Sequence, residues 1–291
     1  MYVKFKNLFF PINSFKSKEY VKTIKKRDIP KKYFHKSDRH NGLILCKIKK
    51  YSIIECEDCK FIHSYPFPKK KDIVKFYETK YYYERKQNYF SIQKSQLNWW
   101  KKIYISRLKI FEKIIGKKGS ILDIGCGPGF FLNEAKKRGW KVAGIDPSPK
   151  AIKYIKKNFR INAINTNYET IDNYLFTKFD LVYNHGVIEH IADPNLFFKK
   201  IKGLLKKGGL FFSSSANEFN KFQLDYLIKK KFKDLSNLRV NPWFLVPPEH
   251  LNYFTHNSIK NLYIKNKFKI INQNSSFPID VFLKNGNDYV V

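Results

Sequence analysis

Two patterns of apolar residues are found in the second part of the chain. Over residues 94–115, apolar side chains recur every three or four positions, as at Leu97, Trp100 and Tyr104. This spacing predicts an amphipathic helix, and Gly116 is a typical residue to end it. After this helix, short apolar runs alternate with helical segments. The alternation predicts an α/β fold: a doubly wound, mostly parallel sheet with helices on both faces.

The expected elements of this sheet follow one another at short intervals. Buried strands are expected over residues 121–124, 142–145, 161–164, 181–183 and 210–213. Helices are expected over residues 130–138, over 149–159 with Ser148 as N-cap and Pro149 in the first turn, and from Pro194 to the glycine pair 208–209.

The pattern of elements divides the chain near residue 93. Residues 1–93 are rich in lysine and tyrosine, contain one Cys-x-x-Cys segment, and are predicted to form a small irregular region. Residues 94–291 carry the α/β pattern, which residues 217–250 interrupt after the fifth strand. We therefore expect a small N-terminal region and one large α/β domain with an insertion.

Lysine dominates the charge of the chain. Its 291 residues include 57 Lys and Arg against 24 Asp and Glu, for a net charge of +33. Clustered cations suit phosphate backbones, but base-edge recognition relies on arginine, and only seven of the basic residues are arginine. Two interpretations stay open: a solvated basic surface, and a surface for an anionic partner such as a nucleotide-sugar, a lipid headgroup or RNA.

Location and redox state are indicated only indirectly. No apolar run approaches the roughly 20 residues that cross a bilayer, so no transmembrane segment is expected. The first 15 residues lack a long apolar stretch and a small-residue cleavage site, so no secretory signal is expected. Four cysteines are too few for a disulfide scaffold at this size. A cytoplasmic protein fits best.

A glycine-rich turn carries the clearest chemistry. Asp123, Gly125, Gly127 and Gly129 lie where the first strand turns into a helix. Glycines let a ligand approach the main chain, and the helix directs free N–H groups toward it. Asp146 ends the second strand, where a carboxylate can accept hydrogen bonds from both hydroxyls of a ribose. The pattern predicts a nucleoside site.

The spacing of the glycines limits which nucleoside the site is expected to bind. A dinucleotide fingerprint needs glycine at position 130, where Phe130 stands, and a phosphate loop ending in Gly-Lys-Ser/Thr is absent. The motif instead resembles motif I of the class I S-adenosylmethionine-dependent methyltransferases, and so do the later segments 142–148, 179–194 and 204–209, which follow in order. The resemblance implies a Rossmann-like sheet of the seven-stranded type and S-adenosylmethionine as cofactor.

The same resemblance assigns a role to each matching position. Asp123 and the three glycines would hold the methionine end of the cofactor. Asp146 would bind the ribose, with Pro147 beside the adenine. Asn184, after the fourth strand, would lie near the sulfonium.

Two outer segments are similar to a narrower group of methyltransferases, common in bacterial surface-polysaccharide clusters. They are the Cys-x-x-Cys segment with the tyrosine-rich stretch that follows, and the C-terminal stretch around residues 247–254. This likeness implies methyl transfer to a sugar, a nucleotide-sugar or another polar small molecule. Residues 217–250 interrupt the alternation after the fifth strand, which is where a lid over the acceptor is expected. The likeness does not determine the acceptor.

Metal binding by the N-terminal region is an open alternative. Members of the narrower group often hold zinc with two cysteine pairs, and a tetrahedral zinc site needs four ligands. Here only Cys56 and Cys59 form a pair. The residues that could complete the set are Cys46, His35, His40 and His63. We favour the interpretation in which the metal has been lost.

Two histidines are candidates for the acid–base step. A hydroxyl acceptor must lose a proton, and histidine suits that task near neutral pH. His190 follows the fourth strand, and His250 lies in the proline-rich segment. Each could instead hold its loop in place.

Two other functions are compatible with the same motifs. One is an RNA methyltransferase that docks its substrate on the basic surface. The other is a catalytically inactive protein that binds the cofactor without turnover. The sequence does not indicate the oligomeric state.

Overall fold

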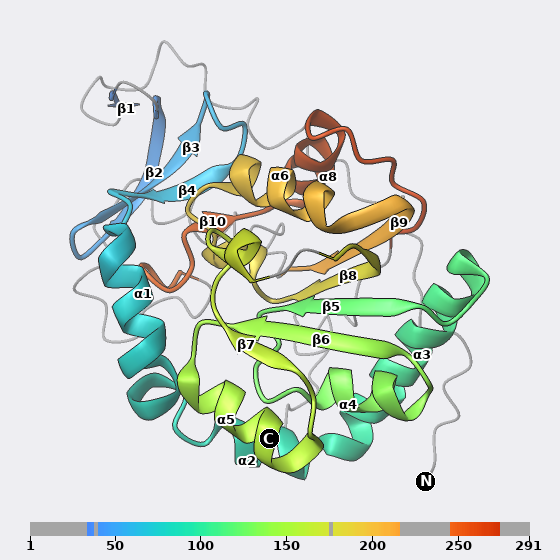
Figure 1. Ribbon diagram of the computed structural model, residues 1–291. Coiled ribbons are helices and arrows are strands. Elements are labelled where there is room, and N and C mark those ends of the chain that lie inside the picture. Colours follow the sequence, from blue (N-terminus) through green and yellow to red (C-terminus); the bar gives the residue numbers. More distant parts are fainter. Residues whose placement is uncertain (1–33, 38–39, 175–176, 216–244, 274–291) are drawn as a thin grey trace, which may run out of the picture. The chain divides into compact units, whose positions relative to one another are not determined.

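The computed structural model describes residues 34–37, 40–174, 177–215 and 245–273 (Figure 1). The chain forms two compact units. The larger contains residues 66–216 and 247–252, and the other contains residues 1–65, 217–246 and 253–291. Each unit is described separately below. No helix among the described residues is long and apolar enough to span a membrane.

The larger unit is built on a parallel sheet of the expected kind. All its neighbouring strands are parallel, in the order β7-β6-β5-β8-β9. The strands are β5 (Ser120–Ile124), β6 (Lys141–Asp146), β7 (Ala163–Asn165), β8 (Phe179–His185) and β9 (Leu205–Ser214). These are five strands within the described residues; the seven-stranded form stays a prediction.

Helices pack on both faces of this sheet, as the alternation predicted. The helices of the domain are α3 (Leu97–Ile115), α4 (Phe130–Lys137), α5 (Pro149–Phe159) and α6 (Pro194–Leu204). Consecutive residues of β9 show the two faces, because neighbouring side chains of a strand point in opposite directions. Phe211 lies against Phe197 of α6, whereas Phe212 lies against Phe111 of α3. The fold is therefore a doubly wound, Rossmann-like α/β sheet.

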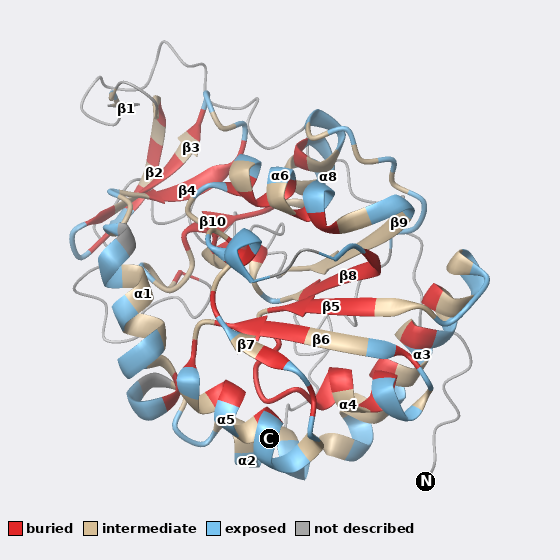
Figure 2. Cartoon of the chain, viewed as in Figure 1, coloured by how far each residue is buried: buried red, intermediate tan, exposed pale blue. Residues whose placement is uncertain are grey.

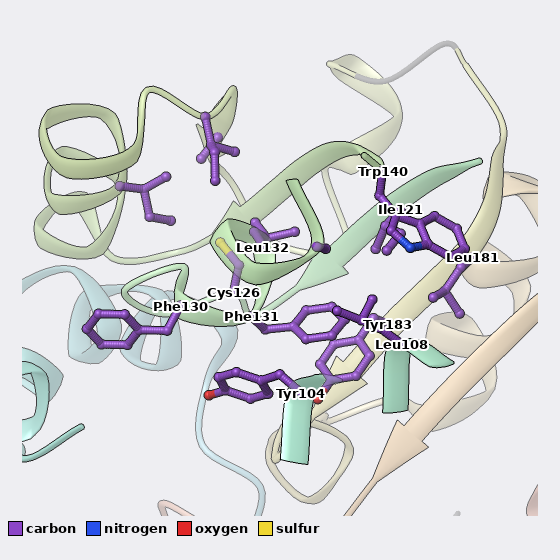
Figure 3. Close-up of a cluster of buried hydrophobic side chains, with 14 of the residues drawn as sticks. Tyr104, Leu108, Ile121, Cys126, Phe130, Phe131, Leu132, Trp140, Leu181 and Tyr183 are labelled. Carbon is purple, nitrogen blue, oxygen red and sulfur yellow. The ribbon is translucent and has the colours of Figure 1, made fainter. Parts of the chain in front are cut away.

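The main hydrophobic core lies between the sheet and helices α3, α4 and α5 (Figure 3). Tyr183 of β8 is at its centre, stacked on Phe131 with ring centroids 3.7 Å apart and on Phe212 at 4.8 Å. Its hydroxyl accepts a hydrogen bond from Arg107, which satisfies the polar end of an otherwise buried ring. Figure 2 colours red the buried residues of both units, those of this core among them.

Two sequence-based boundaries and one expected helix cap need correction. The helix after Pro194 ends at Leu204, four residues before Gly208, and β9 begins at once. The pairing of β8 with β9 shifts in register between Leu205 and Leu210 of β9, and the glycine pair lies in this irregular stretch. The third strand begins at Ala163 and not at residue 161. Ser148 is the N-cap of α5, but its side chain makes no capping hydrogen bond.

Residues 66–95 pack with the larger unit. They form α1 (Lys70–Thr79), a π-helical turn η5 (Tyr81–Arg85) and α2 (Tyr89–Ser95). The first segment of the smaller unit ends at Tyr65, and the larger unit begins at Pro66. The domain boundary expected at residue 93 stays a prediction.

The smaller unit contains helix α8 (His256–Lys265) and a sheet in which β1, β2, β3 and β4 pair antiparallel. Its strands are β1 (Phe34–His35), β2 (Gly42–Ile48), β3 (Tyr51–Cys56), β4 (Ile62–Tyr65) and β10 (Asn252–Tyr253), with Tyr253 of β10 in this unit. The expectation of an irregular N-terminal region was wrong for residues 40–65, because buried and exposed positions alternate along β2 with period two. Residues 217–244 of the expected lid lie outside the described residues.

Candidate active site

The carboxyl ends of β5, β6 and β8 bring the predicted cofactor residues to one edge of the sheet. Ile124 at the end of β5 pairs with Ile145 on one side and with Asn184 on the other. The loop 125–129, Asp146 and Asn184 therefore follow three adjacent parallel strands at the same end. Ligands of such sheets bind at this edge.

Glycine is required at two positions of the loop. Gly125 has φ +73°, and a Cβ there would lie 2.4 Å from Cγ2 of Val187. Gly127 has φ +50°, and a Cβ there would lie 3.2 Å from the hydroxyl of Tyr82. A larger residue would be strained at both. Gly129 also has positive φ and leads directly into α4, as the motif predicted.

Asp146 is buried, and its carboxylate is hydrogen-bonded to the glycine loop that it faces. Its Oδ2 accepts a hydrogen bond from the N–H of Gly127 at 2.9 Å, and its Oδ1 accepts one from the N–H of Ser148 at 2.9 Å. Burial raises the pKa of Asp146 to about 6, although these two hydrogen bonds oppose the rise. Each carboxylate oxygen keeps a second lone pair, so the group can accept further hydrogen bonds from a ligand.

The remaining predicted cofactor residues lie around this carboxylate. Asp123 is buried at the end of β5, and burial, followed by the charge of Asp146, raises its pKa well above the usual value. Asn184 is fully buried, and its Nδ2 donates to the carbonyl of Ile124 at 3.3 Å. Pro147 is half-buried in the turn that leads to α5. Their ligand contacts stay predictions.

A group of tyrosines on η5 and its neighbours was not singled out as part of the site. Burial is the main cause that raises the pKa of Tyr77, Tyr81, Tyr82 and Tyr89, and the charge of Asp146 contributes in each case. Tyr82 lies against the glycine loop, and Lys150 of α5 donates to its carbonyl oxygen at 2.7 Å. The tyrosine run 81–83 was the available signal, but nothing in its spacing placed it at the loop.

The two candidate catalytic histidines lie together. The rings of His190 and His250 are 4.8 Å apart between centroids and nearly perpendicular. The Nδ1–H of His190 donates to the carbonyl of Glu249 at 2.5 Å, and the N–H of Leu251 donates to the carbonyl of Glu189 at 2.9 Å. These hydrogen bonds connect two segments that are 59 residues apart in the sequence at His190 and Glu249.

The surroundings of this pair are polar and partly buried. Desolvation is the largest influence on His190 and lowers its pKa, although the charge of Glu189 opposes the effect. Oε2 of Glu189 is buried and has no hydrogen-bond partner among the described residues. A buried carboxylate oxygen of this kind is suited to accept a hydrogen bond from a ligand. The catalytic role of the two histidines stays a prediction.

Cys56 and Cys59 belong to the other compact unit. Cys56 ends β3 and Cys59 lies in the following turn, both in the smaller unit. The N–H of Cys59 donates to Sγ of Cys56 at 3.4 Å, and both cysteines are free thiols.

The fold is a doubly wound α/β sheet, and sheets of this class bind ligands at the carboxyl ends of their strands. A family model described as a methyltransferase domain matches residues 99–273, which is more than half of the chain. The chain belongs to this methyltransferase family.

Curated relatives carry related names. The chain is similar to the ubiquinone biosynthesis O-methyltransferase of Coxiella burnetii (strain Dugway 5J108-111), with 35% identity over 116 residues, which is 38% of this chain and 50% of the relative. It is also similar to the protein of that name from Pelagibacter ubique, with 29% identity over 184 residues, 58% of this chain and 76% of the relative. The chain spans about half the length of the first of these relatives.

Solved structures show a similar arrangement over part of the chain. The plantazolicin methyltransferase BpumL in complex with SAH covers 74% of this chain and 85% of its own, at 16% identity and a TM-score of 0.49. CalS10, an amino pentose methyltransferase from Micromonospora echinaspora, covers 40% of this chain and 51% of its own, at 17% identity and a TM-score of 0.37.

Proposed function

We propose that this protein transfers a methyl group from S-adenosylmethionine to a hydroxyl of a polar small molecule, with a sugar or nucleotide-sugar as the preferred class. The observation that carries the proposal is the buried carboxylate oxygen of Glu189 beside His190, on the sheet edge that also holds the glycine loop. An acceptor hydroxyl needs a hydrogen-bond acceptor and a base, and this edge offers both.

The cofactor supplies the methyl group and the leaving group when bound. The residues of the chain bind and orient it. Asp146 accepts hydrogen bonds from the ribose hydroxyls through its remaining lone pairs. The loop 125–129 and the N-terminus of α4 offer N–H groups to the carboxylate of the methionine end. Burial keeps the phenols of Tyr81 and Tyr82 protonated, and Tyr82, whose hydroxyl faces Gly127, shields the loop from water.

His190 takes the proton of the acceptor. Donation from its Nδ1–H to the carbonyl of Glu249 leaves the lone pair on Nε2. The lowered pKa keeps the ring neutral at pH 7, so Nε2 is ready to accept a proton. Nε2 would accept the proton released when the acceptor O–H bond breaks, and the methyl–sulfur bond that the new C–O bond replaces would leave its electron pair on the sulfur of the cofactor. His250 and Glu189 position the ring and the hydroxyl.

The acceptor class rests on two kinds of support. The relatives' printed names specify an O-methyltransferase, which favours oxygen as the methylated atom. The likeness of the outer segments to the polysaccharide-cluster group favours a sugar. The interaction of a carboxylate oxygen with a hydroxyl fits both a sugar and a phenol.

Turnover with labelled cofactor tests the proposal. The full chain is incubated with nucleotide-sugars, free sugars, phenolic quinone precursors and RNA. We expect label in one small-molecule class. His190→Gln should lower kcat by about 10²–10⁴-fold and leave the affinity for the cofactor unchanged, because the hydrogen bond of His190 runs to Glu249 and its ring packs against His250 and Tyr77. His256→Gln, on α8 in the smaller unit, is the matched control.

Three outcomes would contradict the proposal. Label in RNA alone would replace the acceptor with a nucleic acid. Cofactor binding without turnover on any acceptor would favour the inactive alternative. Unchanged kcat in His190→Gln would remove the base from the mechanism.

A further inference from the structure

Four metal-ligating side chains meet in the smaller unit, remote in sequence from the proposed active site. One ligand atom from each of His40, Cys56, Cys59 and His63 lies within 4.8 Å of every other. His40 precedes β2, Cys56 ends β3, Cys59 lies in the next turn, and His63 is in β4. The family match begins at residue 99, so it does not reach these residues.

We propose that these four residues form a Cys₂His₂ zinc centre. Zn–S bonds of 2.3 Å and Zn–N bonds of 2.0–2.1 Å at tetrahedral angles separate the ligand atoms by about 3.4–3.8 Å. Nδ1 of His40 already lies 3.5 Å from Sγ of Cys59 and 4.0 Å from Sγ of Cys56. The set therefore needs only a small contraction to coordinate the ion.

The turn between the cysteines has the shape of a metal knuckle. The N–H of Lys60 donates to the carbonyl of Cys56 at 3.0 Å, and the N–H of Cys59 donates to Sγ of Cys56 at 3.4 Å. Lys60 has φ +67°, a left-handed conformation that lysine adopts only where the surroundings impose it. An N–H directed at sulfur stabilises the thiolate that zinc requires.

The two histidines are oriented for coordination. The rings of His40 and His63 are 4.8 Å apart between centroids, at 79°. The Nδ1–H of His63 donates to the carbonyl of Ser64 at 3.0 Å, which leaves the lone pair on Nε2. A backbone carbonyl commonly selects the tautomer of a metal-binding histidine in this way.

Further contacts hold the loop of His40 over the cysteine turn. Oδ2 of Asp58 accepts hydrogen bonds from the backbone N–H of Asn41 at 2.6 Å and from its side-chain amide at 3.0 Å. The N–H of Glu57 donates to the carbonyl of Asn41 at 2.7 Å. The residue next to His40 is thus tied to the two residues between Cys56 and Cys59.

A metal at this place would join several elements of the smaller unit. All four cysteines of the chain are free, so the thiols of Cys56 and Cys59 are not held in a disulfide. An ion bound by the four residues would link β3, β4 and the loop before β2.

Metal content and cobalt spectroscopy of the full chain test the proposal. Wild type purified from zinc-supplemented cells should carry one zinc per chain by mass spectrometry. After chelation, titration with Co²⁺ should produce a sulfur-to-cobalt charge-transfer band and the visible bands of a tetrahedral ion. Cys59→Ser should lose the zinc and at least half of the charge-transfer intensity. Cys46→Ala, which removes a cysteine of the same unit outside the set, should keep both.

A milder variant separates coordination from folding. Asp58→Ala leaves the four ligands in place and should weaken zinc binding by about 10–100-fold, as loss of an outer contact does at other zinc sites. Circular dichroism confirms that each variant is folded. A wild type that binds neither zinc nor cobalt stoichiometrically would overturn the proposal, and so would full zinc content in folded Cys59→Ser.

Discussion

Cofactor binding should depend on pH through Asp146. Only the ionised carboxylate offers lone pairs on both oxygens to the ribose while it accepts the two loop N–H groups. With a pKa of about 6 in the free protein, about nine-tenths of the carboxyl groups are protonated at pH 5 and almost none at pH 8, so affinity should fall about tenfold from pH 8 to pH 5. The loss should be centred near pH 6.

The stability of the free protein should change in the opposite direction. The carboxyl pKa rises from about 3.9 in the unfolded chain to about 6 in the folded one. Its favourable contribution is therefore complete below about pH 4 and is lost as the pH rises through 6. Two pKa units correspond to roughly 3 kcal/mol, and Asp146 is 5% exposed, so little of this is screened by solvent.

Calorimetric titration with S-adenosylmethionine between pH 5 and 8 measures the effect on binding. Asp146→Asn should bind weakly at every pH and show no step near pH 6, because an amide has one acceptor oxygen and does not ionise in this range. Asp172→Asn, which changes an exposed carboxylate, should keep the step. A wild-type affinity that is flat from pH 5 to 8 would refute the role of Asp146 as the ribose acceptor.

Other substitutions test the surroundings of the site and the core. Tyr82→Phe should weaken cofactor binding by about three- to tenfold in the same titration, the cost of one hydrogen bond, because its hydroxyl faces the loop at Gly127. Glu112→Gln should lower the free energy of unfolding in urea by about 1 kcal/mol, since Glu112 is partly exposed and bonds the guanidinium of Arg138 through both oxygens. Leu108→Ala should lower it by about 2–5 kcal/mol, because Leu108 is fully buried. Unchanged affinity or stability in any of the three would contradict the contact concerned.

The order of strands and helices could be predicted because each element carries its own signal. The buried runs of β5 and β8 and the glycine loop between β5 and α4 are local, so the sequence placed Asp123, Asp146 and Asn184 at one sheet edge. Boundaries were less accurate where tertiary pairing decides them. β9 extends back to Leu205 because Leu205 pairs with Phe179 of β8 before the register shifts, and no local signal distinguishes that extension from a helix end.

Local sequence patterns could not predict which residues far apart in the chain lie together in the structure. Tyr82 reaches the glycine loop from a π-helical turn whose sequence shows only a run of tyrosines. His40 and His63 lie 16 residues before and four residues after the Cys56–Cys59 pair, a spacing without a recognised pattern. They meet the cysteines because β2, β3 and β4 pair antiparallel and return the chain to the same place.

The position of His250 shows how a prediction from the sequence and the contacts in the structure complement each other. Its segment was assigned to the acceptor side on sequence alone, and the reason it reaches His190 is a set of backbone contacts. Besides the contacts made by Glu249 and Leu251, Nδ2 of Asn252 donates to the carbonyl of Ile191 at 2.6 Å and to that of Ile188 at 3.3 Å. Asn252 is fully buried, so these bonds are shielded from water and hold the segment firmly. The segment 249–252 is therefore anchored to the loop that follows β8 by its own hydrogen bonds, and His250 takes its place beside His190 through that anchoring.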